Sequence, residues 1–131
     1  MTSSTIYGVG VDIVQIERIQ KALDRFGERF IHRILTDTER RDFYRLHQQP
    51  RILASRFAAK EAFVKALGTG FRFGLVHRDI GVGNDELGKP FLVLSNRALD
   101  LMRQRGAAQG HISLSDEIHY ALAFVVLEKV V

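Results

Sequence analysis

The chain has 131 residues, 46% of them hydrophobic and 26% charged, and it contains no cysteine. The length predicts one domain covering residues 1–131, and the lack of cysteine excludes disulfides, thiol nucleophiles and cysteine-bound metal centres. No apolar run approaches the roughly 20 residues of a membrane-spanning helix. The first five residues carry no basic side chain and precede no apolar signal core, so we expect a cytoplasmic protein without an export peptide.

Positive charge is concentrated in one part of the chain. The net charge is +4, from 19 basic and 15 acidic side chains, and residues 15–60 hold 11 of the basic but only 6 of the acidic ones. Such a segment favours an anionic partner: a nucleic acid, an acidic protein or a phosphate-rich ligand. Composition does not choose among the three.

The first half of the chain predicts one strand followed by four helices. The expected elements are a strand at 6–14 and helices at 15–26, around 30–34, at 36–46 and at 52–67. The strand alternates strictly between apolar and small or polar residues. The first helix carries an apolar face that ends at Phe26, Thr36–Glu39 matches a capping box, and Gly68 ends the long helix.

The second half is richer in strands. The expected elements are strands at 79–83 and 91–94, a helix at 95–105, and a terminal hairpin of strands at 111–115 and 119–128. Residues 84–90 form a dense turn signal between the first two strands. Ser95 is a candidate cap for the helix, and Gly106 follows its end. These elements predict a single-domain α+β fold in which a mostly antiparallel sheet accompanies a long buried helix.

Asp12 is the first candidate for chemistry. It shares one face of its strand with Gly8 and Gly10, while Val9 and Val11 lie on the other face. Glycines leave space on that face for a ligand or another backbone to approach closely. Asp12 could equally be the N-cap of the helix that follows.

Glu61 is the second candidate. The helix at 52–67 is apolar nearly all round and should be buried, and Glu61 continues its apolar stripe, so it points toward packed surface. A buried carboxylate is costly unless it is paired or bound to a metal. The structural alternative is an i,i+4 ion pair with Lys65. Arg56 and Lys60 share a different edge of the same helix, more than about 100° away.

Arg18, Lys21, Arg25 and Arg29 form a basic stripe on the helix at 15–26 and just beyond it. A stripe of one sign is suited to docking an acidic helix, although most charged helical faces only solvate the fold.

Two further segments have both a functional and a structural interpretation. His111 and Ser113 share one face of a terminal strand, where such residues are usually only half-exposed. Gly68-Thr69-Gly70 could turn backbone N–H groups toward a phosphate, but the end of a helix also accounts for Gly68. No local pattern marks a serine nucleophile or a complete dinucleotide-binding glycine motif.

Three blocks of sequence together resemble the holo-acyl-carrier-protein synthase family: GVGVDIVQIERI at 8–19, RFAAKEAFVKALGTG at 56–70 and HISLSDEIHYA at 111–121. The resemblance extends over nearly the whole chain in the same order. It implies the 4′-phosphopantetheinyl transferase fold. It also implies transfer of 4′-phosphopantetheine from coenzyme A to a serine of apo acyl carrier protein, releasing adenosine 3′,5′-bisphosphate and supporting fatty acid biosynthesis.

The same resemblance implies roles for individual residues. Asp12 and Glu61 would bind Mg²⁺, with Lys65 as a third catalytic residue that contacts phosphate; Arg56, Lys65, Gly68, Thr69, Gly70 and His111 would hold coenzyme A; and Arg18, Lys21 and Arg25 would dock the carrier. It further implies a homotrimer with sites between subunits. The proton of the acceptor serine could pass to Glu61 or to a water on the metal, and the sequence leaves both open.

Two alternatives use the same features differently. A small nucleic-acid-binding domain would place the basic stripe on phosphate backbones, but the chain has no tryptophan and no known binding motif, and Glu61 would be left unexplained. A metal-dependent nuclease would use both carboxylates, although such sites usually gather more acidic residues.

Overall fold

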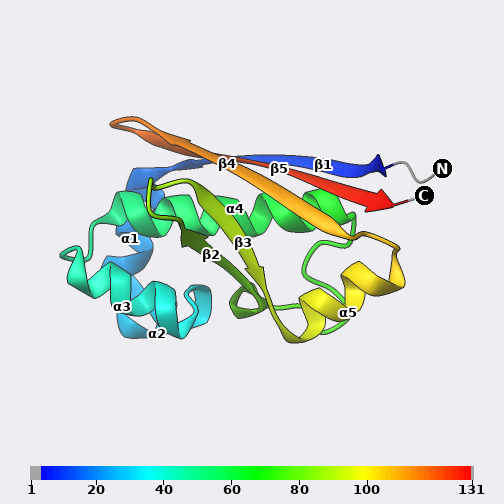
Figure 1. Ribbon diagram of the computed structural model, residues 1–131. Helices are drawn as coiled ribbons and strands as arrows, with labels where there is room; N and C mark the ends of the chain where they lie inside the picture. The colour runs from blue at the N-terminus through cyan, green and yellow to red at the C-terminus, as the bar shows by residue number, and fades with distance from the viewer. Residues whose placement is uncertain (1–3, 131) are drawn as a thin grey trace.

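The computed structural model describes residues 4–130, and its centre is the helix α4 (Pro50–Leu67). A three-stranded antiparallel sheet lies along one side of this helix (Figure 1). Its strands, in spatial order, are β1 (Ser4–Gln15), β5 (Tyr120–Val130) and β4 (Gln109–Asp116). The long buried helix and the antiparallel pairing are as the sequence predicts.

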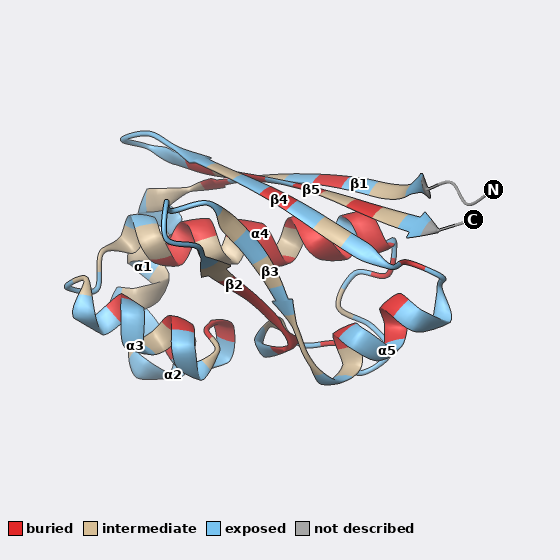
Figure 2. Ribbon diagram, in the orientation of Figure 1, coloured by how far each residue is buried: buried red, intermediate tan, exposed pale blue. Residues whose placement is uncertain are grey.

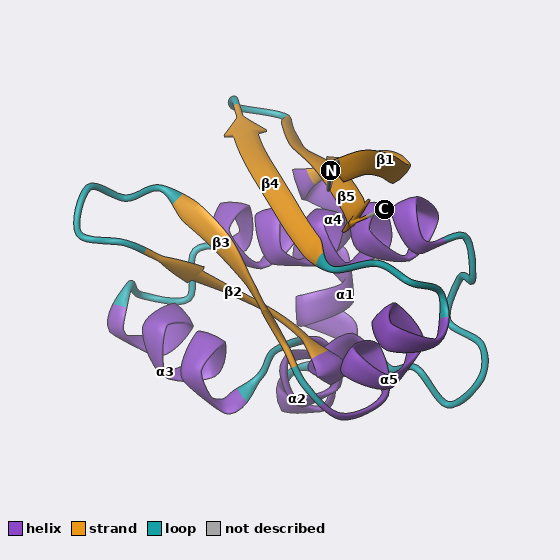
Figure 3. Cartoon of the chain, turned by 45° about the vertical axis from the view of Figure 1, so that its right-hand side comes forward, coloured by secondary structure: helices purple, strands orange, loops and turns teal. Residues whose placement is uncertain are grey.

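The sheet expected from the sequence is divided into two. β2 (Ile80–Asn84) and β3 (Pro90–Leu94) form a separate antiparallel pair, with β3 beside β4 and β2 in contact with α4 (Figure 3). The remaining helices are α1 (Ile16–Phe26), α2 (Glu28–Ile34), α3 (Asp37–Arg45), α5 (Asn96–Gln104) and the short 3-10 helix η1 (His77–Asp79) before β2. Because α5 connects β3 to β4, these strands are not joined by a hairpin turn. In the described part of the chain, no helix is both long and apolar enough to cross a membrane.

Glycines let β1 lie directly on α4. A Cβ atom added to Gly8 would be 2.1 Å from the carbonyl oxygen of Ala66, and one added to Gly10 would be 2.0 Å from that of Ala62. Both contacts are with backbone, which cannot move aside without moving the helix. The glycine face of the strand therefore receives another backbone, one of the two possibilities that the sequence left open, and Asp12 is held beside α4.

Along the strands of the three-stranded sheet, buried residues alternate with more exposed ones (Figure 2), so the two faces of the sheet differ in burial. On β5, Ala121, Ala123, Val125 and Leu127 are buried against α4. On the opposite face, Val9, Val11 and Ile13 are each at least half exposed, at 54%, 50% and 62%. Phe124 pairs with Val11 in the register and is also exposed. The alternation of β1 thus places an apolar surface on the outside of the protein.

A buried ion pair connects α3, α4 and β2. The Lys60 side chain is fully buried, its Nζ lies 2.7 Å from Glu39 Oε1, and it also donates to the carbonyl oxygen of Ile80. Glu39 completes the predicted capping box with Thr36, and its other oxygen accepts from the backbone N–H of Val82 at 3.0 Å. Every charge in this group therefore has a partner.

Two sequence expectations about helices are met only in part. Ser95 precedes α5 at the N-cap position, but within the described part of the chain its side chain forms no capping bond to the helix; its hydroxyl lies 3.5 Å from the carbonyl oxygen of Asp79. Phe26, on the last turn of α1, is exposed, so the apolar face of this helix is buried at Ile19 but not at its end.

Candidate functional site

Asp12 and Glu61 line the same hollow, which has a volume of about 380 Å³ and which we call the Asp12–Glu61 hollow. Strand β1 brings Asp12, helix α4 brings Glu61, and α1 and α2 close the remaining sides. The other lining residues are Ile13, Val14, Arg18, Ile19, Ala22, Phe30 and Phe57. A mainly apolar wall therefore surrounds two carboxylates and one guanidinium group.

Asp12 is not a helix cap. Gln15 occupies the N-cap position of α1, three residues later, because β1 continues past Asp12. Instead, Lys65 Nζ donates to Asp12 Oδ1 at 3.0 Å and to the carbonyl oxygen of Val11 at 2.9 Å. Burial raises the pKa of the Asp12 carboxyl above its usual range; the ion pair with Lys65 opposes this rise, and the Glu61 carboxylate adds to it. The two carboxylates therefore repel each other electrostatically.

Glu61 does not form the i,i+4 ion pair with Lys65 that served as its structural alternative, because Lys65 reaches across to β1. Its side chain is 28% exposed, and Oε1 lies 3.4 Å from Nε2 of His77. The His77 ring is stacked between Phe71, with centroids 3.9 Å apart, and Phe57, at 5.7 Å. Sequence reasoning missed His77, because Phe57 and Glu61 belong to the earlier helix α4 and no local spacing connects them with His77.

The residues present fit Mg²⁺ bound together with a substrate. Within residues 4–130, no three His, Cys, Asp or Glu side chains gather into a group able to enclose a metal ion. Mg²⁺ typically takes one or two carboxylates, keeps several waters and completes its shell with substrate phosphates. Two oxygen-donor side chains that repel each other across a half-buried hollow match this requirement. They do not match a metal site built from the protein alone.

Arg56 and His111 lie apart from this hollow. Arg56 Nη2 donates to Asn84 Oδ1 at 3.0 Å, so it faces the turn between β2 and β3. His111 Nε2 lies 3.3 Å from Glu128 Oε2 on β5. His111 and Ser113 share the exposed face of β4, as the alternation predicts. One chain therefore does not bring all the predicted coenzyme A residues together.

The turn after α4 ends the helix. Gly68 adopts the left-handed conformation with φ 83°. The backbone N–H groups of Gly68, Thr69 and Gly70 all point at the carbonyl oxygen of Val64, at 2.9, 3.2 and 3.4 Å. These N–H groups close the helix and do not form a phosphate cradle, and the Thr69 hydroxyl donates to the carbonyl oxygen of Gly70 at 2.8 Å.

The members of the basic stripe on α1 have different surroundings. Arg18 lines the Asp12–Glu61 hollow. Lys21 forms an exposed ion pair with Glu17, 3.5 Å away, and the Arg25 guanidinium lies 5.1 Å from the centre of the Phe26 ring. A neighbouring hollow of about 260 Å³ is lined by Phe26, Arg29, Phe30 and Arg33. Phe30, on α2, lines both hollows, so the two hollows adjoin.

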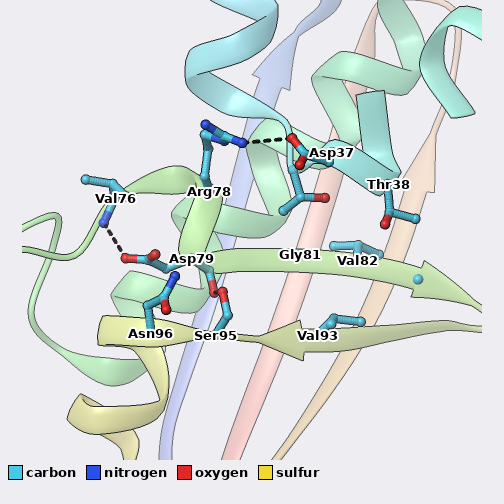
Figure 4. A pocket seen from close by; sticks show the side chains of 12 residues that line it. Asp37, Thr38, Val76, Arg78, Asp79, Gly81, Val82, Val93, Ser95 and Asn96 are labelled. Atoms are coloured by element: carbon cyan, nitrogen blue, oxygen red, sulfur yellow. Dashed lines mark hydrogen bonds and ion pairs between the residues drawn. The ribbon is translucent and has the colours of Figure 1, made fainter. Parts of the chain in front are cut away.

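A larger hollow of about 570 Å³ lies elsewhere, between α3, β2, β3 and the start of α5 (Figure 4). There Arg78 contacts Asp37 at 2.9 Å and Asp79 accepts from the backbone of Val76. None of the described residues that line it is a predicted site residue. Size alone therefore does not locate the site.

The chain is similar in sequence to proteins of one enzyme family. The family model of the 4′-phosphopantetheinyl transferase superfamily matches residues 8–124. The holo-[acyl-carrier-protein] synthase of Vibrio parahaemolyticus is 54% identical over 124 residues, which are 95% of this chain and 98% of that protein.

Solved structures of the same enzyme family have a similar fold. The holo-[acyl-carrier-protein] synthase of Neisseria meningitidis has a TM-score of 0.90 at 44% identity, covering 95% of this chain and 100% of that one. The enzyme of that name from Bacillus anthracis, solved in complex with CoA (3′,5′-ADP), has a TM-score of 0.77 at 40% identity, covering 95% and 97%. The chain therefore belongs to the 4′-phosphopantetheinyl transferase superfamily and, within it, to the holo-[acyl-carrier-protein] synthases.

Proposed function

We propose that this protein transfers 4′-phosphopantetheine from coenzyme A to a serine of an apo acyl carrier protein, with Mg²⁺ as cofactor. The observation that carries the proposal is the meeting of Asp12 and Glu61 in one half-buried hollow beside Lys65 and Arg18. In the reaction, the serine oxygen attacks the phosphorus attached to pantetheine. The bond from that phosphorus to the bridging oxygen breaks, and adenosine 3′,5′-bisphosphate leaves.

Asp12 and Glu61 would hold the metal ion. When bound, Mg²⁺ would neutralise charge on the pyrophosphate and polarise the phosphorus under attack. Lys65, fixed by the Val11 carbonyl and Asp12, would place its ammonium group beside the same phosphates. Phe30 and Phe57 form part of an apolar wall, which would lower the local dielectric constant and so strengthen each of these charge interactions. The serine proton could be taken by Glu61 or by water.

Coenzyme A would extend from this hollow toward the turn after α4 and then to a neighbouring subunit. The turn 68–70 has open space beside Gly68 and Gly70, so a ligand could approach its backbone closely. Arg56 and His111 face other surfaces of the chain. They would therefore contact the nucleotide bound at an adjacent subunit.

The exposed face of the three-stranded sheet supports this assembly. Val9, Val11, Ile13 and Phe124 form an apolar surface there, and His111 lies in the same row as Val9 and Val126 in the strand register. A contiguous group of exposed apolar side chains is typical of a surface that contacts another protein. We expect a homotrimer in which this face is buried and His111 reaches the site of its neighbour.

The carrier protein would dock on α1. Arg18, Lys21 and Arg25 are exposed, and Arg18 also lines the Asp12–Glu61 hollow. An acidic helix bound along this stripe would place its adjacent serine near the carboxylates. Charges at the rim of such an interface act mainly on the association rate and on salt dependence. We further propose a cytoplasmic role in fatty acid biosynthesis, because acyl carrier protein is the substrate.

Mass spectrometry tests the proposed function directly. The purified protein is incubated with coenzyme A, Mg²⁺ and an apo acyl carrier protein, and the carrier should gain the mass of phosphopantetheine. Chelation of divalent cations should stop the reaction, and added Mg²⁺ should restore it. An unmodified carrier, together with tight binding of DNA or RNA by the same preparation, would instead support a nucleic-acid-binding domain.

A further inference from the structure

His77 is held in a fixed orientation next to the proposed metal site. Its ring is stacked between Phe71 and Phe57 at interplanar angles of 20° and 21°, and its side chain is only 15% exposed. Phe57 lies on α4 one turn before Glu61, and Phe71 lies just after the turn 68–70. Two aromatic faces therefore restrict the imidazole to one plane.

The polar edge of this ring is directed at Glu61. His77 Nε2 is buried and has no hydrogen-bond partner among residues 4–130. The Glu61 carboxylate oxygen lies 3.4 Å from that nitrogen. A buried polar atom without a partner is uncommon and requires an explanation. A small rotation of the Glu61 side chain would convert this contact into a hydrogen bond.

We propose that His77 is a positioning residue that fixes the Glu61 carboxylate in the orientation that binds Mg²⁺. This inference rests on the proposed function. Metal-binding carboxylates are themselves hydrogen-bonded in most sites, and loss of such an outer partner typically weakens metal binding or activity by about 10–100-fold. The Phe71–His77 stack also connects Glu61 to the segment that follows the turn 68–70.

Mg²⁺ binding to the coenzyme A complex, measured by calorimetry, tests the proposal. His77→Phe keeps an aromatic ring and removes the nitrogen. We expect about 10-fold weaker Mg²⁺ binding, with metal-free coenzyme A affinity and the thermal midpoint nearly unchanged. His77→Gln keeps an N–H donor and should bind Mg²⁺ more tightly than His77→Phe. Wild-type Mg²⁺ affinity in His77→Phe would overturn the proposal.

His32 provides a matched control. Its Nε2 lies 3.6 Å from the Glu28 carboxylate on the exposed surface of α2, and His32→Phe should leave Mg²⁺ affinity unchanged. If His77→Phe does not fold, NMR of the intact protein decides: the imidazole ¹⁵N signals of His77, but not those of His32, should shift when Mg²⁺ is added. Absence of a His77 shift at saturating Mg²⁺ would refute the role. A wild-type enzyme that needs no metal would instead refute the proposed function.

Discussion

Lys60 and Glu61 are consecutive charged residues of α4, but they lie on different edges of the helix and differ in burial and in hydrogen bonding. At the Lys60 edge, the ammonium group is fully buried and contacts Glu39 and the Ile80 carbonyl, while Glu39 also satisfies two backbone N–H groups. At the Glu61 edge, the carboxylate is partly exposed and faces a second carboxylate, Asp12, across a hollow. The two contrasting environments are therefore only one residue apart in the sequence.

The difference separates structural charges from charges available to a ligand. The Lys60–Glu39 pair is hydrogen-bonded by the fold itself, so no binding capacity remains. Asp12 is paired with Lys65, whereas the Glu61 carboxylate has only a His77 contact of 3.4 Å, longer than an ordinary hydrogen bond. A site that must accept a cation and phosphates has to keep such incomplete interactions in the folded state. Here the number of hydrogen-bond and ion-pair partners that a charged group has in the fold therefore distinguishes a ligand-binding group from a structural one better than burial does.

The largest expected effect on stability is at the Lys60 edge. Lys60→Met leaves the buried Glu39 carboxylate without its ion-pair partner, and breaking a buried pair in this way typically costs about 3–5 kcal/mol. We expect a loss of that size in the free energy of unfolding, measured by urea denaturation. Lys65→Met is the matched control. The Lys65 side chain is 54% exposed, so its removal should cost no more than about 1 kcal/mol. Equal losses in the two variants would contradict the comparison.

The next largest effect is expected where β1 touches α4. The Cβ of Gly10→Ala would be 2.0 Å from the Ala62 carbonyl oxygen and 2.7 Å from the Ala66 nitrogen, so strand and helix must separate. Overpacking typically lowers the free energy of unfolding by about 1–3 kcal/mol. Because this clash is with backbone atoms, we expect a loss at the upper end of that range.

Transfer should fall as well in Gly10→Ala, because Asp12 moves away from Glu61. Gly88→Ala is a control in which the added Cβ meets open space and only the positive φ is strained. Loss of stability without loss of transfer in Gly10→Ala would mean that the spacing of Asp12 and Glu61 is not critical.

Local patterns predict local structure well in this chain. The Thr36–Glu39 capping box, the end of α4 at Gly68 and the alternation of β1 all depend on residues close in sequence. Asp12 and Glu61 were candidates from the pattern of their strand and helix, family resemblance added Lys65, and the structure brings the three together. The Lys60–Glu39 pair and the His77 stack were missed, because their partners come from different elements. Asp12 as an N-cap was wrong because β1 extends to Gln15.

Removing a carboxylate at the Glu61 edge should have a small effect on stability but a large one on transfer. Burial and Glu61 raise the pKa of Asp12 above its ordinary value of 3.8 despite Lys65, so the folded protein binds this proton more tightly than the unfolded chain does. Ionised Asp12 therefore costs stability at neutral pH, and the cost disappears as pH falls to the ordinary value and below. Asp12→Asn should be slightly more stable than wild type at neutral pH and equal to it at strongly acidic pH.

Transfer by Asp12→Asn should fall by more than the roughly 10–100-fold that loss of an outer-shell partner costs. Thermal unfolding across pH and the mass assay measure the two effects. Glu61→Gln serves as the paired variant and should lose transfer equally while remaining folded. Normal transfer by either variant would remove that carboxylate from the site.

The smallest expected effect is on carrier docking along α1. Exposed ion pairs typically contribute about 0.2–1 kcal/mol each, so the double change Arg18→Glu/Arg25→Glu should raise the KM for the carrier several-fold. The KM for coenzyme A should change little, and added salt should weaken carrier binding to wild type in the same way, because salt screens the same contacts. Arg41→Glu/Arg103→Glu alters the net charge equally at exposed positions on α3 and α5 and is the matched control. A flat carrier KM in the α1 variant, or an equal rise in the control, would make the stripe a solvated surface and confine the functional charges to the Glu61 edge.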